Sequence, residues 1–192
     1  FPEHRPYAPG DDLRRVDWLA YARTGEPVVK LFRSEEDVVL RLLIDASASL
    51  DWGDPPKIEV ARRLGAAFGY MALAGSQRAQ VLVARNDPDR NEERGAGISR
   101  ASTARRGRGN LGGLLPGLSG AEPGGAVGLA RAVEESVRRS PRPGLLVVLS
   151  DSFDSGPVTP ALGRARAAGH DVSLVQVVAR DEIEPRFEGD YA

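Results

Sequence analysis

Residues 38–51 read VVLRLLIDASASLD, and residues 144–154 read GLLVVLSDSFD. In both stretches an apolar run, typical of a buried β-strand, is followed at once by a carboxylate and hydroxyl side chains. An open α/β sheet builds a binding site in this way, at the carboxyl ends of strands where the strand order reverses. The two stretches therefore predict an α/β fold with an oxygen-rich site between neighbouring strands.

The rest of the chain alternates between helical and strand patterns. Ile58, Leu64 and Phe68 recur at helical spacing and predict a helix over residues 57–74. We predict further helices over 111–118, 127–139 and 159–168, and strands over 28–32, 38–44, 79–84, 145–149 and 172–178, with an edge strand near Ile98. This alternation predicts a mainly parallel sheet.

The two ends of the chain are poorer in such patterns. Residues 1–27 are rich in Pro, Gly and charged side chains, so we expect an irregular N-terminal arm with a turn at Pro9-Gly10-Asp11. We divide the chain into this arm over residues 1–37, an α/β domain over 38–180 and a C-terminal tail over 181–192.

Composition excludes several kinds of protein. The 192 residues carry a formal net charge of −1, so no overall field draws the chain to nucleic acid or an anionic membrane. The chain has no cysteine and two histidines, which excludes disulfides, zinc–thiolate sites and multi-histidine metal centres. No apolar run is long enough to span a membrane. Because the chain begins at Phe1 rather than Met, we expect a piece of a longer product, located in the cytoplasm either free or as the soluble part of a membrane-anchored protein.

The two strand ends supply a candidate metal site. Asp45, Ser47 and Ser49 alternate after the first strand, and Asp151 follows the second. Carboxylate and hydroxyl oxygens are ligands that Mg²⁺ and Mn²⁺ prefer, and a cation would remove the repulsion between converging carboxylates. Such residues also cap helices and form turns, which is the alternative role for them. Asp154 is a further carboxylate in the second loop.

The chain resembles a known family at several places. DASAS at residues 45–49, with a later aspartate at a strand end, resembles the metal-ion-dependent adhesion site of von Willebrand factor A domains. The run EHRPYAPGDDLRRVDWLAYARTGEPVVKLF at residues 3–32 is similar to the signature of the bacterial "domain of unknown function 58" family. The segments LSDSFD and GHDVSLVQV fit the same family, so the resemblance covers nearly the whole chain.

The resemblance implies both a fold and a function. It implies a doubly wound sheet with helices on both faces, the metal site on top, and the strands over 38–44 and 145–149 side by side. It implies a non-enzymatic adaptor whose metal ion binds an acidic residue of a protein partner, working with a MoxR-type AAA+ ATPase in the assembly or maturation of other proteins. From the net charge we also expect no binding of nucleic acid and no direct membrane contact by this part of the protein. The threonine that the adhesion site normally contains falls at Ala126, which implies a weak site.

Two other functions stay open. A phosphatase of the haloacid dehalogenase type would use Asp45 as nucleophile, but Ser47 stands where that class has a second, acid-donating aspartate. No lysine stands before Asp151 in a position typical of that class. The loss of the threonine at Ala126 also leaves open a structural domain with a degenerate metal site.

Overall fold

The computed structural model describes residues 3–31, 38–85, 97–140, 142–154 and 156–185. Its contacts divide the chain into two compact units, Phe1–Asp37 and Val38–Ala192, and each is described by itself. Expectations about residues 32–37, 86–96 and 186–192 fall outside the described residues.

The N-terminal unit holds more regular structure than we predicted for an irregular arm. Strand β1 (Glu3–Pro6) pairs antiparallel with β2 (Val28–Leu31), and between them lie the 3-10 helix η1 (Leu13–Arg15) and the helix α1 (Trp18–Thr24). The Asp17 carboxylate caps α1 by accepting from two backbone amides, and Gly25 ends it with a φ of 74°. No described residue of α1 is buried, so the helix lacks the apolar spacing from which it could have been predicted.

The predicted turn in this unit is confirmed. The amide of Asp11 donates to the carbonyl of Ala8 at 3.1 Å, and Gly10 has a φ of 104°. The guanidinium of Arg5 donates to both carboxylate oxygens of Asp11, at 2.7 and 2.6 Å. This bidentate ion pair joins β1 to the turn.

The second unit is built on a mixed, mainly parallel sheet. Its strands are β3 (Val39–Asp45), β4 (Arg78–Ala84), β5 (Ile98–Ala101), β6 (Arg105–Arg106), β7 (Leu145–Ser150) and β8 (Asp171–Gln176). They lie in the order β5-β4-β3-β7-β8, with β6 also paired to β4. Strands β3, β4, β7 and β8 are parallel to their neighbours in that set, whereas β5 and β6 run antiparallel to β4.

The order of the strands reverses between β3 and β7. The chain passes from β3 to β4 on one side, and later returns to the other side of β3 with β7 and β8. In the β3–β7 register Ile44 lies opposite Leu149, so the residues that follow them meet at one edge of the sheet. The side-by-side placement expected of these two strands is confirmed.

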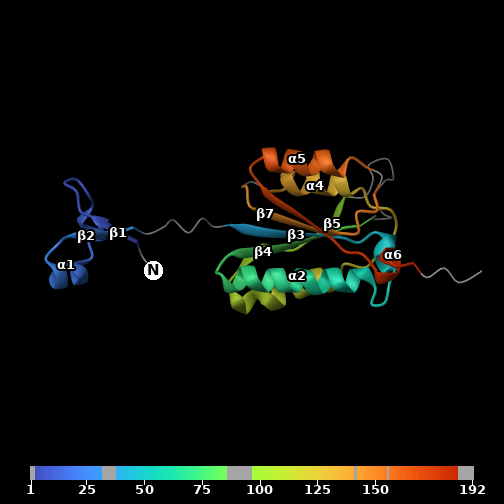
Figure 1. Ribbon diagram of the computed structural model, residues 1–192, viewed down its shortest axis with the longest axis horizontal. Coiled ribbons are helices and arrows are strands. Elements are labelled where there is room, and N and C mark those ends of the chain that lie inside the picture. The colour runs from blue at the N-terminus through green and yellow to red at the C-terminus, as the bar shows by residue number, and fades with distance from the viewer. Residues whose placement is uncertain (1–2, 32–37, 86–96, 141, 155, 186–192) are drawn as a thin grey trace, which may run out of the picture. The chain divides into compact units, whose positions relative to one another are not determined.

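Helices cover both faces of this sheet (Figure 1). The helices of this unit are α2 (Lys57–Ala74), α3 (Leu115–Ser119), α4 (Leu129–Arg138), α5 (Val158–Ala167) and α6 (Arg180–Ile183), with the 3-10 helices η2 (Ala48–Asp51) and η4 (Arg108–Gly113), and α6 lies at the end of the sheet. Because side chains alternate along a strand, β3 sends Leu42 and Ile44 into the core on one face and Leu43 into the core on the other. The first core includes residues of α2 and α3, and the second residues of α4 and α5.

Outside the N-terminal unit, the main differences from the predicted elements lie in two segments. The helix over 57–74 is confirmed, but the helix expected over 111–118 is two short ones, η4 and α3, because Gly112-Gly113 and Pro116 interrupt the pattern. Residues 180–183, mostly within the segment expected to be a tail, form the short helix α6. Among the described residues no helix has the length and apolar character needed to cross a membrane.

Candidate functional site

Strands β3 and β7 each end in a buried polar residue. Asp45, the last residue of β3, is 3% exposed, and Ser150, the last residue of β7, is fully buried. The hydroxyl of Ser150 donates to Oδ2 of Asp45 at 2.6 Å and accepts from the amide of Ser152 at 2.9 Å. A hydrogen bond between side chains therefore joins the ends of β3 and β7, at the point where the strand order reverses.

The four residues predicted to hold a metal form one connected group. Oδ1 of Asp45 accepts from the amide of Ser47 at 2.9 Å, and the hydroxyls of Ser47 and Ser49 lie 3.0 Å apart. The hydroxyl of Ser49 also lies near enough to the Asp151 carboxylate to help lower its pKa. Asp151 is 8% exposed, whereas the two serines are half-buried. The structure thus brings all four side chains together at one edge of the sheet.

The loop expected to carry the missing threonine lies against this group. The amide of Gly124 donates to the carbonyl of Ala46 at 2.9 Å, and the amide of Ala48 donates to the carbonyl of Gly125 at 2.9 Å. Ala126 follows directly and is exposed. The alternative hydroxyls are placed elsewhere, since Ser119 lies on α3 and Thr103 between β5 and β6.

Asp154, the other carboxylate of the second loop, already has a structural role. Its Oδ2 accepts from the amide of Leu129 at 2.7 Å, and its Oδ1 accepts from the amide of Gly156 at 2.8 Å. Leu129 is the first residue of α4, so Asp154 caps that helix from a distant loop.

Two residues that the sequence did not point to complete the group. Nζ of Lys57 lies 2.9 Å from Oδ2 of Asp151 and 2.6 Å from Oε1 of Glu182. The side chains of Lys57 and Asp151 are 3% and 4% exposed, and that of Glu182 is 36% exposed. Lys57 is the first residue of α2, and Glu182 lies in α6, so this ion triad ties the site to both helices.

The two carboxylates differ in their electrostatic surroundings. Burial raises the pKa of Asp45 above its usual range, and the hydrogen bonds from Ser150 and Ser47 offset only part of that effect. The charge of Asp151 raises the pKa of Asp45 further. Burial would also raise the pKa of Asp151, but hydrogen bonds from Lys57 and Ser49 outweigh it and hold that pKa below its usual range. Asp45 is therefore a buried carboxylate without a positive neighbour among the described residues, whereas Asp151 has Lys57.

This asymmetry predicts that Asp45→Asn stabilises the metal-free protein. At neutral pH the substitution removes a buried charge. The asparagine amide group can still hydrogen-bond to the amide of Ser47 and the hydroxyl of Ser150. The free energy of unfolding should therefore rise by about 0.5–2 kcal/mol. Because the folded-state pKa of Asp45 is raised, the wild type takes up a proton on Asp45 as the pH falls through that value and recovers stability. The gain should therefore shrink as the pH falls. Urea unfolding in EDTA between pH 4 and 8 measures it, and a gain that grows on acidification would contradict this account.

The atoms gathered here determine the chemistry available. No group of three or more His, Cys, Asp or Glu side chains is placed to hold a metal ion within the part of the chain that the structure describes. The group instead offers two carboxylates and two hydroxyls, a donor set that suits a hard cation completing its coordination with water or an external oxygen.

Comparison with known proteins identifies relatives of the same kind. The uncharacterised proteins Rv1480 of Mycobacterium tuberculosis and Mb1516 of Mycobacterium bovis are each 33% identical to this chain over 196 residues. The match covers 98% of this chain and 57% of each relative, so the chain spans little more than half of their length.

Solved structures with a similar fold are von Willebrand A domains and adhesins. A von Willebrand factor type A protein from Catenulispora acidiphila matches with a TM-score of 0.50 and 17% identity, over 72% of this chain and 32% of its own. The pilus adhesin SpaC from Lactobacillus rhamnosus GG, in its open conformation, matches with a TM-score of 0.54 and 9% identity, over 74% of this chain and 24% of its own. At these identities the likeness shows the fold, which is von Willebrand A-like.

The sequence family gives the closer assignment. The model of the family described as "Protein of unknown function DUF58" matches residues 3–192, which includes the N-terminal unit as well as the sheet. With its arm signature, its von Willebrand A-like fold and this match over nearly its whole length, the chain belongs to the DUF58 family.

Proposed function

We propose that this chain is a non-enzymatic protein-interaction module that uses a divalent metal ion. Asp45, Ser47, Ser49 and Asp151 would hold Mg²⁺ or Mn²⁺ at the carboxyl ends of β3 and β7. An acidic side chain of a partner protein would then complete the coordination of the ion. A von Willebrand A-like fold is typical of interaction and adhesion modules, which supports the class of function.

The observation that carries the proposal is the buried pair of carboxylates. Asp45 and Asp151 repel each other, burial raises the pKa of Asp45, and Lys57 compensates only Asp151. A divalent cation beside Asp45 would neutralise the second charge. The hydroxyls of Ser47 and Ser49 lie 3.0 Å apart; Ser47 hydrogen-bonds to Asp45 through its amide, and Ser49 helps lower the pKa of Asp151.

Exposed aromatic side chains beside the site favour a protein as the partner. Phe153 is 88% exposed and Trp52 is 62% exposed. The amide of Phe153 donates to Oδ1 of Asp151 at 3.0 Å, and the carbonyl of Trp52 accepts from the amide of Lys57 at 3.0 Å, so both rings stand on backbone fixed to the site. Exposed aromatic residues near a binding centre are typical of protein interfaces.

The partner we propose follows from the family resemblance. The resemblance implies an adaptor that works with a MoxR-type AAA+ ATPase, and we propose this partnership here, in the assembly or maturation of other proteins. The module would supply recognition of an acidic side chain, and the ATPase would supply the energy of nucleotide hydrolysis.

A phosphatase that uses Asp45 as nucleophile has less support from the geometry. Both carboxylate oxygens of Asp45 already accept hydrogen bonds, from the amide of Ser47 and the hydroxyl of Ser150. Lys57 does supply a cation that the sequence did not lead us to expect, but it contacts Asp151. Turnover of p-nitrophenyl phosphate that disappears in Asp45→Asn would favour the phosphatase over an interaction module.

Binding of Mn²⁺ gives the direct test. We expect the wild type to bind one Mn²⁺, seen as enhanced longitudinal relaxation of water protons, because the ion keeps water in its open position. Adding acetate, a mimic of an acidic side chain, should reduce the enhancement as it replaces that water. A dissociation constant of about 0.1–1 mM, which is about 4–5.5 kcal/mol of binding free energy, is the range expected for a site that lacks its threonine.

Matched carboxylate variants serve as controls. Asp45→Asn and Asp151→Asn should abolish the enhancement, whereas Asp154→Asn, in the same loop as Asp151 but engaged in capping α4, should retain it. Absence of enhancement in the wild type, or equal enhancement in all three variants, would reject the metal site. The structural domain with a degenerate site would then be the better description.

A further inference from the structure

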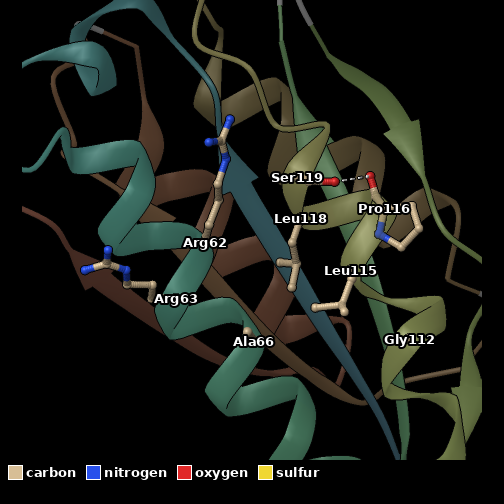
Figure 2. Close-up of a pocket in the computed structure, with 8 residues that line it drawn as sticks. All are labelled: Arg62, Arg63, Ala66, Gly112, Leu115, Pro116, Leu118 and Ser119. Carbon is tan, nitrogen blue, oxygen red and sulfur yellow. Dashed lines mark hydrogen bonds between the residues drawn. The ribbon is translucent and has the colours of Figure 1, made fainter.

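A groove between α2 and α3 has the form of a second binding site (Figure 2). Its volume is about 480 Å³, and its lining residues are Arg62, Arg63, Ala66, Gly112, Leu115, Pro116, Leu118 and Ser119. None of these residues belongs to the proposed metal site. The lining combines an aliphatic floor with basic side chains from one helix.

The walls of the groove are held in place by close packing beneath it. A Cβ atom at Gly65 of α2 would lie 2.9 Å from Cδ2 of Leu118, and one at Gly69 would lie 2.8 Å from Cδ1 of Leu114. A Cβ atom at Gly117 of α3 would lie 3.1 Å from Cβ of Val81 in the sheet. The glycines therefore let α3 and the residue before it approach α2 and β4, which makes the groove a preformed feature.

The floor of the groove is apolar and open to solvent. Leu115 is 48% exposed, whereas Leu118 beside it is 3% exposed and belongs to the core. Figure 2 shows both side chains facing Ala66 of α2 across the groove. This apolar surface of two leucines and an alanine can pack against an aliphatic side chain of a bound ligand.

Arg62 places a positive charge at one end of this floor. Its Nη2 donates to the carbonyl of Ala121 at 2.9 Å, which fixes the guanidinium, and its Nε is buried without a hydrogen-bond partner. No ion pair joins Arg62 to a carboxylate among the described residues, whereas Arg63 pairs with Glu59. In Figure 2 the side chains of Arg62 and Arg63 rise from the same helix on different sides, and the guanidinium groups of both extend away from the leucines. Of the two arginines that line the groove, Arg62 is thus the one without a carboxylate partner among the described residues.

We propose that this groove docks an acidic segment of a partner protein, with an aliphatic side chain on Leu115 and Leu118 and a neighbouring carboxylate on Arg62. The open floor suits an extended segment better than an enclosed small molecule. Nucleic acid is disfavoured because no aromatic side chain lines the groove for base stacking. The inference does not depend on metal binding, since the two sites share no residue.

A pair of glycine variants allows a clean test. A Cβ atom at Gly112 or at Gly109 would meet no atom within 4 Å, and neither residue has a positive φ, so both accept a larger side chain. Both lie in η4, but only Gly112 lines the groove. Gly112→Leu therefore adds a bulky side chain at the lining of the groove, and Gly109→Leu is its matched control.

The probe is a fluorescein-labelled peptide of sequence GSELLESG, and its counterpart GSQLLQSG, measured by fluorescence anisotropy with the full chain. We expect Gly112→Leu and Arg62→Gln each to weaken binding of the acidic peptide about tenfold, equivalent to 1.4 kcal/mol. Gly109→Leu and Asp45→Asn should leave binding unchanged, and the glutamine peptide should bind the wild type about as weakly as the acidic peptide binds Arg62→Gln.

Two results would overturn the proposal. One is equal binding of the acidic peptide to wild type and Gly112→Leu, and the other is no binding to the wild type up to about 1 mM peptide, which corresponds to a free energy weaker than about −4 kcal/mol. Loss of peptide binding in Asp45→Asn together with retention in Gly112→Leu would assign the peptide to the metal site instead. The outcomes of this experiment and of the Mn²⁺ experiment are therefore distinguishable.

Discussion

Replacing Lys57 by methionine is expected to lower the free energy of unfolding by about 3–5 kcal/mol, the usual effect of removing one partner from a buried ion pair. Methionine keeps the apolar stem but leaves the Asp151 carboxylate, whose side chain is 4% exposed, without its positive neighbour. Glu182 also loses the ammonium group that lies 2.6 Å from its Oε1. Urea unfolding in EDTA at pH 7.5 measures the change.

Two further variants serve as controls for the Lys57→Met measurement. Arg63→Met removes an exposed ion pair with Glu59, 68% and 43% exposed, and should change the free energy by less than about 1 kcal/mol. The double variant Lys57→Met/Asp151→Asn removes both buried charges and should recover much of the loss, which also covers the case in which the single variant does not fold. A single variant as stable as the wild type would show that Asp151 does not depend on Lys57.

Saturating Mg²⁺ or Mn²⁺ is expected to stabilise the wild type by about 2.7 kcal/mol when the free ion is at about 100 times its dissociation constant. For a domain of this size the shift in Tm is roughly 5–10 °C. Thermal unfolding in EDTA and in about 10 mM metal measures it, a concentration at which a dissociation constant near 0.1 mM gives the full effect. Asp45→Asn should show no shift, because it removes the carboxylate that has no other counter-charge among the described residues.

The two predictions are linked through Asp151. The ammonium group of Lys57 and the proposed metal ion both neutralise this carboxylate, so the ion should stabilise Lys57→Met by more than it stabilises the wild type. Absence of any shift in the wild type would mean that the group is held together by Lys57 alone. An equal shift in wild type and Asp45→Asn would indicate that the ion binds elsewhere.

The sheet and its long helix could be predicted from sequence because their signals are local. The apolar runs that became β3 and β7 are nearly continuous, as buried parallel strands require, and α2 keeps its apolar spacing over 18 residues. The short helices carry weaker signals. Helix α1 buries none of its described side chains, and α6 has four residues, so neither has the periodicity on which the prediction depends.

Part of the candidate site could be predicted from sequence, because four of its residues directly follow strands that the sequence predicts. Asp45, Ser47, Ser49 and Asp151 follow strands directly, and parallel strands carry such residues to the same edge of the sheet. Lys57 opens a helix, where a lysine is ordinarily exposed, and only the tertiary structure reveals that it is buried against Asp151. Glu182 is 125 residues away from Lys57 in the chain, and no sequence pattern relates them.

The position of β3 in the sheet has a consequence for the synthesis of the protein. Its partner on one side, β4, follows after a single helix, but the contact with β7 joins residues 105 positions apart. At about 5–20 residues per second on the ribosome, β3 presents an unpaired, strongly apolar edge for about 5–20 s before β7 emerges. Such an edge is a template for association between growing chains. Synthesis of the segment between these two strands is therefore an interval in which the growing chain is open to such association.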